Sequence, residues 1–80
     1  MNDTEILRQI EKLVNEEHEL MTKSEGIGLD DDEQSRMKSV EVSLDQCWDL
    51  LRQRRARRGA GLNPDEAEVR PPKVVEHYQQ

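Results

Sequence analysis

Five arginines fall within the seven residues from Arg52 to Arg58, one helical turn after the only tryptophan and the only cysteine of the chain. Such a group could bind a phosphate backbone, or it could supply cationic neighbours to a reactive thiol at Cys47. It could also end a packed helix, where cations interact favourably with the exposed carbonyl groups. The candidate interaction patch therefore consists of Arg52, Arg54, Arg55, Arg57 and Arg58.

The charge distribution favours the helix-end interpretation of this patch. Residues 1–51 carry 14 acidic and 5 basic side chains, whereas residues 52–80 carry 4 acidic and 7 basic ones. We expect exposed arginines that pair in part with Asp3 and Glu5 at the acidic start of the chain. The acidic body would repel nucleic acid, and no aromatic residues alternate with the arginines to stack on bases. Anion or nucleic-acid binding is kept as the alternative function.

Catalysis by Cys47 would need a base, and His18 is the candidate. In an antiparallel pair of helices, His18 lies nine or ten residues away from the level of Cys47, which at 1.5 Å per residue is about 14 Å. The flanking apolar residues predict a buried thiol with a raised pKa. An inter-subunit redox contact and a nucleophile are the less favoured alternatives, and no catalytic residue is predicted.

The stretch NEEHEL resembles a carboxylate and histidine metal cluster, but Asn15 occupies the position three residues before His18 where such sites use Glu. Glu17 falls on the inner face of its helix, where a lone carboxylate is costly unless it is paired. We expect Lys38 or Arg36 as its partner. Phosphate-binding loops and zinc-ligand spacings are also missing from the sequence. No metal and no cofactor are predicted, and the protein is not expected to be an enzyme.

Two helices must position these residues, because apolar side chains recur at three- and four-residue steps over the first two thirds of the chain. The pattern predicts a helix over about 4–23 and a second over about 31–58, with capping-box spacing at Asn2 and Glu5 and again at Asp30 and Glu33. Gly26 is expected to end the first helix in a left-handed conformation. The predicted core contains Ile10, Val14, Met37, Val40, Leu44, Cys47, Trp48 and Leu51.

The fold class expected is all-α: an antiparallel hairpin over 1–59 followed by a mostly irregular, proline-containing tail over 60–80. Asn63 and Pro64 predict one or two helical turns at 64–68. Beyond the two consecutive prolines, Val74, Val75 and Tyr78 either dock on the hairpin, contact a neighbouring molecule or stay loose.

A lone hairpin of two helices has one buried side per helix and needs another layer. A second copy is the simplest layer, because a two-fold pair of hairpins forms a four-helix bundle. We therefore expect a homodimer, with a monomer closed by its own tail and an unidentified protein partner as alternatives.

A single cysteine excludes an internal disulfide, and no apolar run approaches the length of a membrane span. Without a leader pattern, the cytoplasm is the expected compartment and no membrane contact is predicted.

The stretches LDQCWDLLRQRRARR and GLNPDEAEVRPPKVVEHY resemble a family of short actinobacterial proteins classed only as a domain of unknown function. The combination of Cys47, Trp48 and Asp49 with the arginines, and then Pro71 and Pro72, carries the resemblance. It implies a bacterial cytosolic protein of this length and assigns no activity or functional residue. We therefore expect a small interaction or accessory protein that acts through self-association, its arginines and its tail.

Overall fold

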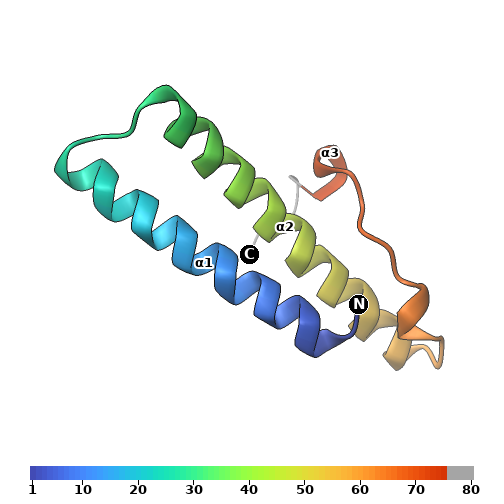
Figure 1. Ribbon diagram of the computed structural model, residues 1–80. Helices are drawn as coiled ribbons and strands as arrows, with labels where there is room; N and C mark the ends of the chain where they lie inside the picture. The colour runs from blue at the N-terminus through green and yellow to red at the C-terminus, as the bar shows by residue number, and fades with distance from the viewer. Residues whose placement is uncertain (76–80) are drawn as a thin grey trace.

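The computed structural model describes residues 1–75, in which two long helices fold back on one another (Figure 1). Helix α1 spans Asp3–Gly26 and helix α2 spans Asp31–Gly59, and the two helices pack against each other. A short 3-10 helix, η1 (Pro64–Glu66), and a single helical turn, α3 (Pro72–Val75), follow. No strand occurs within these residues, so the predicted all-α antiparallel hairpin is confirmed.

Both long helices begin at the predicted capping boxes. The Asn2 side chain accepts a hydrogen bond of 2.8 Å from the Glu5 amide, and the Glu5 side chain accepts one of 3.0 Å from the Asn2 amide. Asp30 and Glu33 make the same reciprocal pair at 2.8 and 3.2 Å. These contacts satisfy amides that have no partner within the helix.

The two helix ends differ in detail from the expectation. Helix α1 continues through Gly26, which stays helical, and the left-handed residue is Gly28 with φ 82°. The amides of Ile27 and Gly28 both donate to the Lys23 carbonyl, at 3.0 and 3.1 Å, which places the reversal two residues later than predicted. Helix α2 ends at Gly59, and Gly61 takes the left-handed conformation there with φ 76°.

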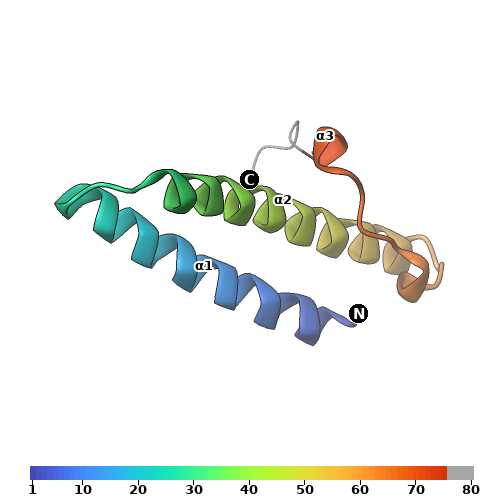
Figure 2. The ribbon, with the colours of Figure 1, turned by 45° about the horizontal axis from the view of Figure 1, so that its top comes forward.

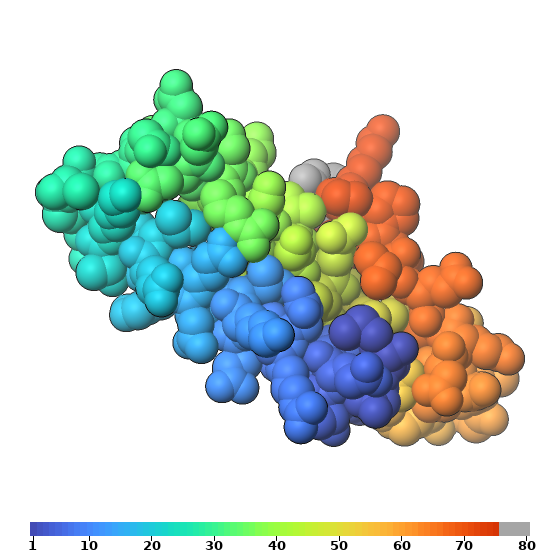
Figure 3. Space-filling view, in the orientation of Figure 1, coloured from blue at the N-terminus to red at the C-terminus, as the bar shows by residue number. Residues whose placement is uncertain are grey.

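Helix α2 lies between α1 and the tail (Figure 2). Both η1 and α3 contact α2, so the segment after Gly61 runs back along α2 on the side away from α1. The molecule is elongated, with extents of 50 × 24 × 18 Å, and the middle of α2 shows as a narrow band between α1 and the tail (Figure 3). The tail is therefore a third layer over residues 62–75, and Tyr78 lies outside the described residues.

The core is a single apolar seam between α1 and α2. It is formed by Ile6, Ile10, Leu13, Val40, Leu44 and Leu50, with Cys47, Leu51 and Ala67 packed against it in part. Val75 of α3 is fully buried. Burying a side chain of this size stabilises the fold by about 1.5 to 3 kcal/mol.

Three predicted core residues, Val14, Met37 and Trp48, are not in this seam. Val14 is 43% exposed and Trp48 is 37% exposed, whereas Met37 is half-buried. The prediction that Val14 and Trp48 are buried is wrong for this single chain, because a pair of helices encloses only the side chains that point directly at the other helix. Residues at the edge of the seam, such as Val14 and Trp48, point toward solvent instead.

Candidate functional site

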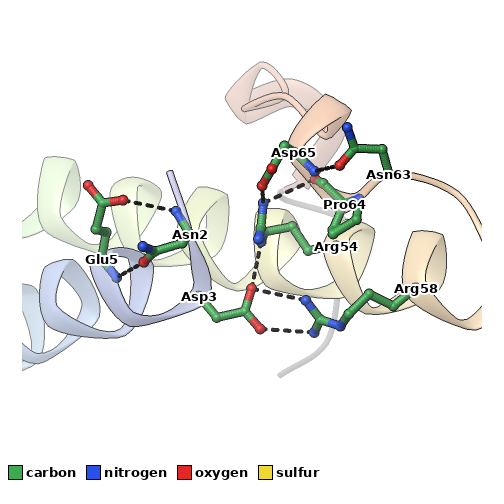
Figure 4. Close-up of polar contacts among 8 residues, drawn as sticks. All are labelled: Asn2, Asp3, Glu5, Arg54, Arg58, Asn63, Pro64 and Asp65. Carbon is green, nitrogen blue, oxygen red and sulfur yellow. Dashed lines mark hydrogen bonds and ion pairs between the residues drawn. The ribbon is translucent and has the colours of Figure 1, made fainter.

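Arg54 lies at the centre of the arginine-rich end and is only 6% exposed. Its Nε donates to Asp3 Oδ1 at 2.5 Å, and its Nη1 donates to Asp65 Oδ1 at 3.0 Å and to the Pro64 carbonyl at 3.1 Å (Figure 4). One guanidinium thus joins the start of α1, the last turns of α2 and η1. The prediction that Arg54 is an exposed patch residue is wrong, because the heptad register of α2 continues beyond Leu51 and turns Arg54 inward.

These ion pairs shift the pKa values of Asp3 and Arg54, which join the start of α1 to the last turns of α2. The hydrogen bonds from Arg54 and then Arg58 hold the pKa of Asp3 below its ordinary value of 3.8. The hydrogen bond to Asp3, followed by that to Asp65, raises the pKa of Arg54. Asp3 and the Arg54 guanidinium are therefore both charged at neutral pH, and each stabilises the other's charged form.

The other four arginines differ from Arg54 and from one another in their partners and exposure. Arg58 Nη2 lies 2.9 Å from Asp3 Oδ2, and Arg57 Nη1 lies 3.5 Å from Glu66 Oε2. Arg52 is half-buried, and Arg55 is exposed and makes no ion pair with residues 1–75. The expected pairing with Asp3 is confirmed for Arg54 and Arg58. The expectation that all five arginines are exposed is wrong, because Arg54 is buried and Arg52 and Arg57 are half-buried.

The tail is fastened to α2 by a second polar joint that the sequence analysis missed. Asp49 is fully buried and accepts two hydrogen bonds from Arg70, one of them from Nε at 2.8 Å. Gln53 Nε2 donates to Asp49 Oδ2 at 2.9 Å and to the Glu68 carbonyl at 2.7 Å. Gln46 Nε2 donates to the Arg70 carbonyl at 3.1 Å. One face of α2 thus holds the backbone of the tail through amide side chains.

A sequence signal for this joint exists. Gln46, Asp49 and Gln53 recur at steps of three and four residues on the side of α2 away from the apolar seam. A polar stripe at helical spacing, followed by a proline-containing segment with a single arginine before its two prolines, predicts a docked tail. Together with the burial of Val75, this joint explains why the segment 62–75 is not loose.

Cys47 borders the seam and is half-buried. It lines a hollow of about 310 Å³ between α1, α2 and the tail, together with Ile6, Leu50 and Val69 among others. Burial raises the pKa of the Cys47 thiol, which lowers its reactivity at neutral pH. His18 is exposed on α1 and is not among the residues around this hollow.

The acidic stretch near the end of α1 pairs differently from the expectation. Arg36 binds Glu16 with both Nε and Nη2, the latter at 2.7 Å, and these bonds hold the pKa of Glu16 below its ordinary value. Glu17, for which Arg36 or Lys38 was expected, instead lies half-buried at the edge of a groove. Within residues 1–75, no group of three or more His, Cys, Asp or Glu side chains could hold a metal ion.

The groove that Glu17 borders lies between α1 and α2. It is a hollow of about 420 Å³ lined by Val14, Glu17, Glu41, Leu44, Asp45 and Trp48. Leu7 and Met21, 50% and 47% exposed, lie seven residues before and after Val14 and so share its side of α1. We call the set Leu7, Val14, Met21 and Trp48 the apolar face. The set consists of one aromatic and three other apolar side chains, and the acidic residues Glu17, Glu41 and Asp45 of the groove border it.

The chain matches the family model described as a protein of unknown function (DUF2630), over residues 2–80. The chain belongs to this family. An uncharacterized protein of Mycobacterium bovis is 48% identical over 77 residues, which is 95% of this chain and 88% of the relative. Uncharacterized proteins of two Mycobacterium tuberculosis strains match with the same identity and coverage. No solved structure matches the chain.

Membership of this family confirms the resemblance seen in the sequence, and the mycobacterial relatives agree with the actinobacterial source that it implied. Neither the family nor these relatives carry a described activity, so the function must be argued from the surfaces above. Among residues 1–75, no helix is long and apolar enough to cross a membrane.

Proposed function

We propose that this protein is a small non-enzymatic interaction protein that works as a homodimer and uses its apolar face for self-association. One observation carries the proposal: Val14 and Trp48 line the groove between α1 and α2 and are exposed, and Leu7 and Met21 are exposed on the side of α1 that Val14 occupies. Clusters of large apolar side chains on a small protein mark interaction sites, and tryptophan is enriched among residues that dominate binding energy.

The position of the tail supports this choice of face. The tail covers the side of α2 away from α1, and it is held there by Arg70, Val75 and the two glutamines of α2. The apolar face contacts neither η1 nor α3 through its α1 residues, because these elements contact α2 alone. A second hairpin stacked on this face would complete a four-helix bundle.

The chemistry of the single thiol supports a non-enzymatic role. Burial raises the pKa of Cys47, whereas catalytic thiols have a lowered pKa and a base within hydrogen-bond reach. The pairing of Arg54, Arg57 and Arg58 with carboxylates of the same chain likewise weakens the anion-binding alternative. We propose the cytoplasm as its compartment, since one cysteine cannot form the internal disulfides of small extracellular domains.

Light scattering and sedimentation equilibrium at several concentrations test the proposal. The wild-type protein should have twice the chain mass of 9.4 kDa at micromolar concentration. Val14→Glu should give the monomer, because it places a charge in the centre of the apolar face. Leu62→Glu is the matched control: Leu62 is 57% exposed beyond the end of α2, and its substitution should leave the dimer intact. A monomeric wild-type protein, or equal effects of the two variants, would contradict the proposal.

A further inference from the structure

We propose that the second copy docks antiparallel with the two-fold axis at Trp48, so that Glu41 of each copy pairs with Arg55 of the other. This inference rests on the proposed self-association and specifies its register and the residues that set it. The partner is a second copy of this chain, chosen by the charge pattern of α2.

The pattern is symmetric in position and opposite in sign around Trp48. Glu41 lies seven residues before Trp48 and Arg55 seven residues after it, and seven residues are close to two helical turns. All three side chains therefore project from the same side of α2. Glu41 and Arg55 are exposed, and neither makes an ion pair with any residue between 1 and 75. Both charges are thus available to a partner.

A two-fold axis perpendicular to α2 at Trp48 places each position opposite its mirror position on the partner's α2. The position seven residues before the axis then faces the position seven residues after it, which gives two Glu41 to Arg55 pairs in one dimer. The two indole rings meet near the axis, where aromatic side chains contribute most to an interface. Glu41, Trp48 and Arg55 of α2 therefore supply two ion pairs and one contact between indole rings.

The residues of α1 fit the same register. Val14 lines the same groove as Glu41, Leu44 and Trp48, and we take its level as that of Leu44, which lies in the middle of this stretch of α2. Trp48 is one turn beyond Leu44 along α2, and this corresponds to the level of position 10 on α1. An axis at that level places Leu7 opposite the partner's Val14, because positions 7 and 14 are almost equally far from it. Two apolar contacts thus flank the central tryptophans.

Other registers do not pair these charges. An axis at the level of Leu44 would place Glu41 opposite the partner's Cys47, because both lie three residues from that axis, and the Glu41 carboxylate would then face no cation. A two-fold axis parallel to the helices would place α2 over the partner's α1, so Glu41 and Arg55 would not face each other. Of these arrangements, the register centred on Trp48 pairs both charges.

Charge reversal and mixing test the register. Glu41→Arg and Arg55→Glu each replace two attractive pairs by two repulsive ones, and each should weaken the homodimer about tenfold, as four surface charge contacts of a few tenths of a kcal/mol would. An equimolar mixture of the two variants should recover wild-type affinity, because arginines then face glutamates at both pairs. The double variant Glu41→Arg, Arg55→Glu should also recover it. Fluorescence anisotropy of labelled protein measures each dissociation constant.

Matched controls repeat the charge changes away from the apolar face. Glu19→Arg and Arg8→Glu alter exposed residues on the opposite side of α1 and should leave the dissociation constant unchanged. Circular dichroism verifies that every variant is helical, as expected for exposed positions. A wild-type dimer whose single variants are unaffected, or whose mixture fails to recover affinity, would overturn the register while leaving self-association standing. A wild-type protein that does not self-associate would overturn both.

Discussion

The joint between Asp49 and Arg70 allows a quantitative prediction for Arg70→Ala. Asp49 is fully buried, and the Arg70 side chain is 36% exposed. Removing one partner of a buried ion pair costs about 3 to 5 kcal/mol, because the other charge stays buried without its countercharge. Water reaches the Arg70 end, so we expect a loss near the lower limit, about 3 kcal/mol. For a domain of this size, that corresponds to a fall in melting temperature of about 12 to 24 °C.

The assay is thermal unfolding followed by circular dichroism at one fixed protein concentration, with hydrogen exchange of the α3 amides as a local readout. Arg70→Lys keeps the charge but loses the two-pronged geometry, so it should fall between wild type and Arg70→Ala. Arg8→Ala, an exposed change on α1, should alter stability by no more than about 0.5 kcal/mol. If Arg70→Ala were as stable as Arg8→Ala, or if α3 exchanged no faster, the tail would not be held by this pair.

Three further predictions concern the helix ends. Arg54→Ala should lower the free energy of unfolding, measured by chemical denaturation, by about 2 kcal/mol, because two charge-assisted hydrogen bonds are lost at a buried position. A decrease below about 0.5 kcal/mol would refute the role of Arg54 in joining the helix ends. The pKa of Asp3 is lowered in the fold, so its contribution is present above pH 3.8 and is lost as the pH falls through the folded value. Asp3→Asn should therefore flatten the dependence of stability on pH in acid, and an unchanged slope would contradict the pairing. Gly28→Ala should destabilise by about 1 to 2 kcal/mol because φ is 82°, whereas Gly26→Ala, at a helical position, should stabilise by up to about 1 kcal/mol; equal effects in thermal melts would show that the reversal lies elsewhere.

Local signals were sufficient to predict where the helices begin. Asn2 with Glu5 and Asp30 with Glu33 form capping boxes whose partners are three residues apart, so neighbouring residues alone determine them. The antiparallel hairpin follows from two amphipathic segments joined by a short connection. The end of α1 was placed too early, because either Gly26 or Gly28 can adopt the required positive φ and only the backbone decides between them.

The burial of charged residues whose environment depends on distant segments was not predicted. Periodicity assigns charged residues to the surface, yet Arg54 is buried because Asp3 and Asp65, far away in sequence, supply its partners. Asp49 is buried because Arg70 of the tail covers it. Conversely, Trp48 was predicted to be in the core because it belongs to an apolar face of its helix. The spacing of apolar residues does not show how many neighbouring elements are present to cover that face.

Tryptophan fluorescence over a dilution series tests the central claim most directly, since Trp48 is the only tryptophan of the chain. The emission maximum and acrylamide quenching are measured from nanomolar to high micromolar protein. Self-association through the apolar face predicts a concentration-dependent blue shift with reduced quenching, as the indole moves from water into the dimer interface. An emission typical of a water-exposed indole, unchanged at every concentration, would contradict the account.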